Sequence, residues 1–90
     1  MMKAIITVLG PDKVGIIAAV CVYLSNNGIN ILDLSQTIVG GFFNMLMIAD
    51  FTHSPLGFDE AAAGLARLGR EIGLEIKLQR EDIFNSMHRI

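Results

Sequence analysis

The residues best suited to chemistry form one short turn, Gly10-Pro11-Asp12-Lys13-Val14-Gly15-Ile16, which separates an apolar run from a helical pattern. The first N–H groups of a helix are unpaired and partly positive, so a helix that begins in this turn can hold a carboxylate. Gly15 is expected in the first helical turn, where Gly is about 1 kcal/mol less favourable than Ala. That cost indicates either close packing of another backbone segment, the more common reason, or the approach of a ligand.

Gly10 and Asp12 each have two interpretations. Gly10 fits a turn that requires a positive φ, and it also leaves room for a ligand. Asp12 fits the N-cap of the helix and equally fits an acceptor for a ligand. The turn is not a phosphate loop, because no Gly-Lys-Ser/Thr follows, and two glycines are too few for a dinucleotide motif.

The remaining reactive residues do not form a catalytic pattern. His53 and His88 lie in no spacing that pairs them with a nucleophile or a second metal ligand. Cys21 lies inside an apolar helical stripe and is interpreted as a small buried side chain. Asp59 and Glu60 fall in the first turn of a predicted helix, where they complement its dipole. The sequence therefore predicts no enzyme activity, no metal site and no cofactor.

The elements that must position the turn are a strand before it and a helix after it. Residues 3–9 are apolar and rich in β-branched side chains, which predicts a strand buried on both faces at the centre of a sheet. The helix is expected to begin at an Asp12 N-cap and to end in the Ser25–Gly28 segment. Its predicted apolar stripe consists of Val14, Ile17, Cys21 and Leu24.

Two strands joined by a tight turn are predicted next. Residues 29–38 read as a strand whose alternation slips at Leu32 to Leu34, which indicates a bulge. Gly40-Gly41 predicts a hairpin, and residues 42–51 return as a strand with alternating faces. Residues 58–72 then predict a second helix with an apolar stripe of Phe58, Ala62, Leu65, Leu68 and Ile72.

The end of the chain alternates and then becomes helical in pattern. Gly73 is a natural helix stop. Apolar and polar residues alternate over 74–79, which predicts an edge strand with one face buried and the other exposed to solvent. After this strand, a short apolar helical face consists of Ile83, Phe84, Met87 and Ile90. We expect a domain over residues 1–81 and a tail over residues 82–90 that docks on its own or a partner subunit.

The predicted order β-α-β-β-α-β is that of an α+β, ferredoxin-like sandwich: a four-stranded antiparallel sheet with two helices on one face. The other face stays bare and is expected to carry phenylalanine and methionine side chains from the 42–51 strand. An apolar face of this size marks an association surface, so a homodimer is predicted.

Composition limits the partners further. The 90 residues carry seven Lys and Arg against nine Asp and Glu, a net charge of −2, which gives no basic field for nucleic acid. Hydrophobic residues make up 52% of the chain, more than one small core can hide. A single cysteine forms no internal disulfide and fits a reducing cytosol. No apolar stretch approaches membrane-spanning length and no signal peptide is evident, so we expect a cytoplasmic protein without a membrane partner.

The turn, the helix that follows it and the segment Asn27-Gly28-Ile29-Asn30-Ile31 together resemble the first half of an ACT domain, an amino-acid-sensing module. The resemblance extends over about residues 3–80. The ending, residues 80–90, is similar to the tail of small stand-alone ACT proteins of bacteria and archaea that are largely uncharacterised. Two departures are that many ACT modules have Pro where this chain has Val14, and that we expect no attached enzyme domain for the module to regulate.

The resemblance implies a dimeric sensor that binds a small molecule, usually an amino acid, between subunits or beside the first turn. Backbone N–H groups would hold the carboxylate, and Asp12 or Asn30 would accept from the ammonium group. Carried over residue by residue, the binding site would consist of Gly10, Asp12, Val14, Gly15, Ile16, Asn30 and Ile31.

Three alternatives remain beside the sensor. A ligand-free module that dimerises or docks an unidentified protein partner fits the same sequence. An RNA-binding domain of this topology would have a similar aromatic-rich third strand, here Gly41-Phe42-Phe43-Asn44-Met45, but the cations around it are missing. A small phosphatase would need an arginine in the first turn, which is also missing.

Overall fold

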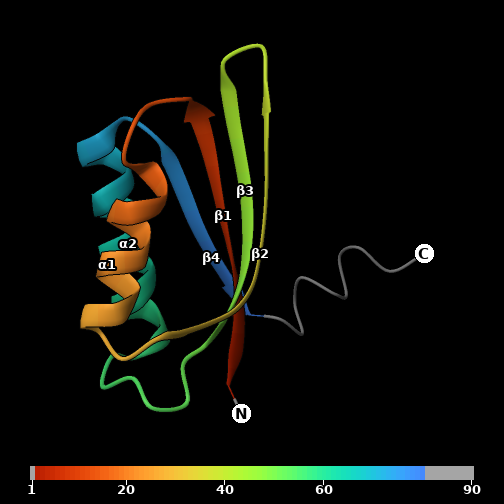
Figure 1. Cartoon of the computed structure of the whole chain (residues 1–90). Coiled ribbons are helices and arrows are strands. Elements are labelled where there is room, and N and C mark those ends of the chain that lie inside the picture. Colours follow the sequence, from red (N-terminus) through yellow and green to blue (C-terminus); the bar gives the residue numbers. More distant parts are fainter. Residues whose placement is uncertain (1, 81–90) are drawn as a thin grey trace.

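The structure is a computed structural model that describes residues 2–80. Its elements are β1 (Lys3–Pro11), α1 (Ile16–Asn26), β2 (Asn30–Val39), β3 (Phe42–Asp50), α2 (Phe58–Ile72) and β4 (Glu75–Arg80). The sheet has the strand order β2-β3-β1-β4, and all neighbouring strands are antiparallel. Both helices cover one face of the sheet (Figure 1). The ferredoxin-like fold is therefore confirmed, whereas the predicted tail over residues 82–90 lies outside the described residues.

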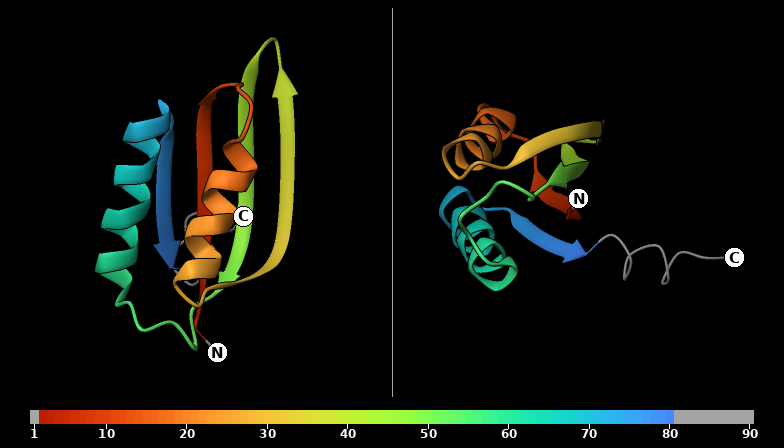
Figure 2. Two further views of the ribbon diagram at one scale, coloured as in Figure 1. Left: turned by 60° about the vertical axis from the view of Figure 1, so that its left-hand side comes forward. Right: turned by 90° about the horizontal axis from the view of Figure 1, so that it is seen from below.

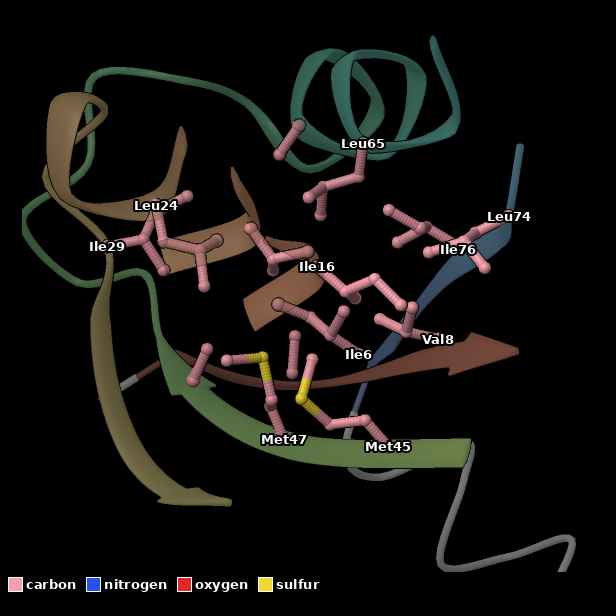
Figure 3. Close-up of a cluster of buried hydrophobic side chains, with 14 of the residues drawn as sticks. Ile6, Val8, Ile16, Leu24, Ile29, Met45, Met47, Leu65, Leu74 and Ile76 are labelled. Atoms are coloured by element: carbon pink, nitrogen blue, oxygen red, sulfur yellow. The ribbon is translucent and has the colours of Figure 1, made fainter. Parts of the chain in front are cut away.

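The main core lies between the helices and the sheet. Alternate residues of a strand point to opposite faces, so every second side chain of β1 and β3 faces the helices. Ile6 and Val8 of β1 meet Met45 and Met47 of β3 there, under Leu65 of α2 (Figure 3). β1 and β3 occupy the centre of the sheet because their helix-facing residues are the most apolar, while β2 and β4 form its edges.

The glycine turns are where the sequence predicts them. Gly40 and Gly41 have φ of 56° and 80°, which suits the two-residue hairpin between β2 and β3. Gly73 ends α2 in the left-handed conformation with φ of 75°. The register of β2 against β3 shifts between Ile31 and Asp33, so the predicted bulge is also confirmed.

One prediction about the bare face of the sheet is wrong. The methionines of β3, Met45 and Met47, face the helices and are fully buried, and only Phe42 of the phenylalanines in this strand is exposed. Alternation within the strand was predicted, but the choice of face depends on pairing with β1, where Val8 lies opposite Met45.

The predicted apolar stripes of both helices are confirmed in part. Leu24 and Leu65 are buried, and the other predicted residues except Val14 and Ala62 are half-buried against the core. The buried residues of α1 are Ile16, Val20 and Leu24, while Val14 precedes the helix and is exposed. In α2, Ala61 rather than Ala62 is buried. The physical reason in α1 is a later start, since Gly15 and not Asp12 occupies the N-cap position.

Candidate functional site

The turn between β1 and α1 is held at both ends by hydrogen bonds. The Asp12 backbone N–H donates to the Gly41 carbonyl at the tip of the hairpin, over 2.8 Å. The Lys13 Nζ donates to the Ile72 carbonyl at the end of α2, over 2.6 Å. A cation near the C-terminus of a helix also complements its dipole. The turn is thus fixed between the hairpin and α2, and its polar backbone is presented to solvent.

Gly15 is required by its backbone conformation. It is the N-cap of α1 in the left-handed region, with φ of 89°, and an added Cβ would meet no atom within 4 Å. Close packing of a second backbone segment therefore does not explain this glycine. The predicted N-cap role of Asp12 is also wrong, because α1 has no side-chain cap hydrogen bond.

Gly10 serves the fold in two ways. Its φ of 153° is unfavourable for other residues, so the predicted positive φ is confirmed, but Gly10 lies within β1, paired with Phe43, and not in a turn. A Cβ at this position would lie only 2.4 Å from Cδ2 of Leu74, in the turn between α2 and β4. Gly10 is buried, so its place in the predicted binding site is behind the turn rather than at its surface.

A first hollow of about 300 Å³ opens beside the start of α1. Three predicted site residues, Asp12, Gly15 and Ile16, line it. The Ala19 N–H is bonded to the Gly15 carbonyl, and the N–H groups that precede it in the helix have no acceptor within α1. Val14, also predicted, is fully exposed and does not line this hollow. The remaining lining residues are Lys13, Ile17, Ala18, Gln36, Ile38 and Phe43.

A second hollow of about 390 Å³ lies at the other end of α1. The two remaining predicted site residues, Asn30 and Ile31, line it together with Cys21, Ser25, Gly28 and Ile29. Asn30 is exposed, whereas Ile31 is half-buried and packs against the core. This hollow has one amide and one hydroxyl side chain but no charged group.

Within one copy of the chain, the two hollows do not form one site. Gly10 is paired with Phe43, and Ile38 with the same Phe43, so the first hollow is at one end of the sheet. Asn30 is paired with Asp50, whose other neighbour is Lys3, so the second hollow is at the opposite end. The predicted residues are therefore divided between both ends of α1 and β2.

The surface between the two hollows is poor in charge, because Asp33 is the one charged residue of α1 and β2. α1 contains no charged residue, and its Val22 side chain is 57% exposed. Beside it, β2 forms an edge of the sheet (Figure 2). This strand has no charge after Asp33 and exposes Leu34 and Ile38. The opposite edge, β4, carries Glu75 and Lys77, which form an ion pair of 3.0 Å. Because charges on an edge strand oppose pairing with another strand, β2, which carries Asp33 alone, is better suited to pairing than β4.

The other reactive side chains between residues 2 and 80 either have a role in the fold or do not gather into a group that could bind a metal ion. Oε1 of Glu60 accepts the Gly57 N–H over 3.1 Å, so this carboxylate caps α2. Cys21 packs against the core but is half-buried rather than buried as predicted. It also lines the second hollow, which was not predicted. Between residues 2 and 80, no three His, Cys, Asp or Glu side chains lie close enough to share a metal ion.

Several residues that line the hollows were not predicted as site residues, and three of them come from β2 or the end of α1. Gln36 and Ile38 reach the first hollow from β2, and Ser25 reaches the second from the end of α1. The signal for Gln36 and Ile38 was their alternation with Ser35 and Thr37, which puts them on the helix side of an edge strand. That signal could be used only once the edge position of β2 was known.

Comparison with known proteins gives consistent results. A family model described as "ACT domain" matches residues 3–79. A UPF0237 protein of Bifidobacterium longum is 54% identical over 90 residues and is covered completely, as is this chain. The ACT domain protein from Streptococcus pneumoniae superimposes with a TM-score of 0.82 at 35% identity, over 92% of this chain and 93% of that one. A protein assigned as a glycine cleavage system transcriptional repressor gives a TM-score of 0.77 at 28% identity, over 88% of this chain and 45% of that one.

No helix in the described part is long and apolar enough to span a membrane.

Proposed function

Since the chain belongs to the ACT domain family, we propose that it is a cytosolic homodimeric regulator that binds a neutral α-amino acid between two copies. ACT domains generally bind small molecules such as amino acids for regulation, and one structural neighbour is assigned as a repressor. The observation that carries the proposal is the division of the predicted site between two hollows at opposite ends of the β2 edge, where Asp33 is the one charged residue.

A two-fold axis through the edge of the sheet would join the two hollows. If β2 pairs antiparallel with β2 of a second copy, residue 30 of one strand approaches the residue 38 end of the other. The first hollow of each copy then faces the second hollow of its partner. Each of the two composite sites would contain Asp12 from one copy and Asn30 from the other.

The chemistry of the composite site suits an amino acid. The uncapped N–H groups at the start of α1 can bind the carboxylate, because the helix end is partly positive. The Asp12 carboxylate makes no hydrogen bond to another described side chain or backbone group and is available for the ammonium group. It is the one acidic side chain that lines the hollows.

The side chain of the ligand is expected to be neutral. Lys13 is the one cation in the lining, and its ammonium group is already bonded to the Ile72 carbonyl. The other lining side chains are mainly apolar, such as Ile17, Phe43 and Ile29. A charged ligand side chain would lose its hydration here without gaining a partner.

The first test is the melting temperature of the protein with each of the twenty amino acids. A ligand at one hundred times its Kd adds about 2.7 kcal/mol, which raises the Tm of a domain of this size by several degrees. Asp12→Ala and Asn30→Ala should each abolish the shift, whereas Ser35→Ala, on the other face of β2, should keep it. If no amino acid raises the Tm, a ligand-free docking module replaces the sensor.

A mixing experiment tests the composite site itself. Neither Asp12→Ala nor Asn30→Ala alone leaves an intact site, but a mixed dimer has one site in which both wild-type residues meet. After exchange of subunits, about one site in four should be restored, as expected for random pairing in a two-fold dimer. Isothermal titration of the mixture would measure this fraction. Binding that stays absent in the mixture would place both residues in one copy's site and contradict the proposal.

A further inference from the structure

The sheet face opposite the helices carries an apolar strip. Ile5 and Leu9 of β1 point to this face, because Ala4, Ile6 and Val8 between and beside them point into the core. Leu46 and Ile48 of β3 lie next to them, with Ile5 directly paired with Ile48. Both helices are on the other side of the sheet (Figure 2). We define Ile5, Leu9, Leu46 and Ile48 as the apolar strip.

Ile5 is too well buried for a residue on an open face. It is 4% exposed, and it is the one buried apolar residue of the described chain that does not belong to the helix-side core. Its neighbours across the sheet are Ile48 and Gln79, which shield its flanks but not the direction away from the sheet. No helix or strand within residues 2–80 lies over this direction.

We propose that residues 81–90 cover the apolar strip of their own chain as a short amphipathic helix. The segment starts at the right place, because β4 ends at Arg80, which is paired with Ala4 and is therefore adjacent to Ile5. Ten helical residues span about 15 Å, and the distance from Ile5 to Leu9 along an extended strand is about 13 Å. The segment thus has the length of the strip.

The composition of the segment fits the same role. Its apolar residues follow a helical spacing and form one stripe, while the intervening residues are polar: the stripe consists of Ile83, Phe84, Met87 and Ile90. A helix this short is marginal in water and needs an apolar surface to dock on. Direct attachment to β4 gives the chain's own strip a high effective concentration, which favours it over the strip of a second copy.

Disulfide capture tests this placement in the full-length chain. Cys21 is the sole cysteine, so a Cys21→Ala background leaves no competing thiol. In that background we would combine Met87→Cys with either Leu46→Cys or Ile48→Cys, and oxidise under mild conditions. At least one pair should form a bridge within one chain, because a bridge requires Cβ atoms about 4 Å apart. The matched control combines Met87→Cys with Gln36→Cys, which lines the first hollow beside α1, and should stay reduced.

Non-reducing electrophoresis and peptide mass spectrometry distinguish the outcomes. An intrachain bridge in most molecules supports the proposal. Bridges that join two chains would show that the segment covers the strip of a second copy, and capture no stronger than the control would show that it does not cover the strip. Either result overturns the proposal and leaves the amino-acid site untouched, since that site is on the α1 side.

A stability measurement provides an independent readout. Phe84→Ser, in the apolar stripe, should lower the Tm by several degrees and increase the fluorescence of an apolar-surface dye. Ser86→Ala, in the polar part of the same segment, should change neither. A Tm for Phe84→Ser equal to that of the wild type would also overturn the proposal.

Discussion

The two helices of this domain pack on the same sheet face but differ in what they leave exposed. α2 has a charged outer surface that includes Arg67 and Arg70, and Glu60 caps its first turn. α1 has no charged residue, exposes Val22 and begins at a glycine without a side-chain cap. α2 is thus complete in one copy of the chain, as an amphipathic surface helix is. α1 lacks both the charged outer surface and the side-chain cap, and it is the helix on which the proposed dimer interface and ligand site are placed.

A charge placed on the outer surface of each helix gives the largest expected difference. Val22→Glu would bury a carboxylate in the proposed dimer interface and should raise the dimer Kd about 100-fold, or about 2.7 kcal/mol. Ala63→Glu, at an exposed position of α2, should leave the Kd unchanged. Sedimentation velocity over a dilution series measures both constants. If both substitutions changed the dimer Kd equally, α1 would not be the helix that lies in the dimer interface.

The N-cap glycines of the two helices should also respond differently to alanine. Gly15 is in the left-handed region at the start of α1, where a Cβ costs about 1–2 kcal/mol. Gly57 begins α2 with φ of −72° and ψ of 163°, a conformation open to any residue. Chemical denaturation should show that loss for Gly15→Ala and a change below about 0.5 kcal/mol for Gly57→Ala. A neutral Gly15→Ala would mean that the turn relaxes to another conformation.

Removal of the carboxylate that caps α2 should have a smaller effect. Glu60→Ala loses the hydrogen bond to the Gly57 N–H and the favourable interaction with the helix dipole, together about 1 kcal/mol of unfolding free energy. Glu71→Ala, near the negative end of the same helix, is the matched control and should be neutral or slightly stabilising. Thermal unfolding of both variants measures the difference. Similar losses in both would indicate that helix propensity, and not the cap, controls this helix.

The sequence was sufficient for the order of elements, the hairpin and the helix stops. Each of these depends on local chemistry: alternation in the strands, paired glycines at 40–41, and a left-handed glycine at 73. The family resemblance, drawn from the turn and the helix after it, was also confirmed by the comparisons. The start of α1 was not predictable in the same way, because both Asp12 and Gly15 are acceptable N-caps and the positive φ of Gly15 decided between them.

The arrangement of the predicted site depended on tertiary information that the sequence lacks. Asn30 and Asp12 are separated by α1 alone along the chain, yet the helix carries one to the far end of the sheet from the other. Their separation becomes evident only from the strand register, in which Asn30 lies opposite Asp50. The contribution of Gln36 likewise depended on β2 being an edge strand. The membership of these residues in one site stays a prediction.

The smallest expected effect concerns Asp50, whose carboxylate accepts hydrogen bonds within the fold, whereas the Asp12 carboxylate beside α1 accepts none from the described residues. Asp50 accepts hydrogen bonds from the Thr52 hydroxyl, over 2.5 Å, and from the Thr52 N–H, over 2.9 Å. These two bonds lower the pKa of Asp50 in the folded state, with the hydroxyl bond the larger cause. A lowered folded pKa stabilises the protein above the ordinary Asp pKa, and this stabilisation is lost as the pH falls through the lowered value.

The free energy of unfolding, measured from pH 7 down to pH 3, should therefore decrease slightly more for the wild type than for Asp50→Asn. Thr52→Val, which keeps the backbone bond, should lie between them, and a wild-type curve parallel to that of Asp50→Asn would show that these bonds add no pH-dependent stability.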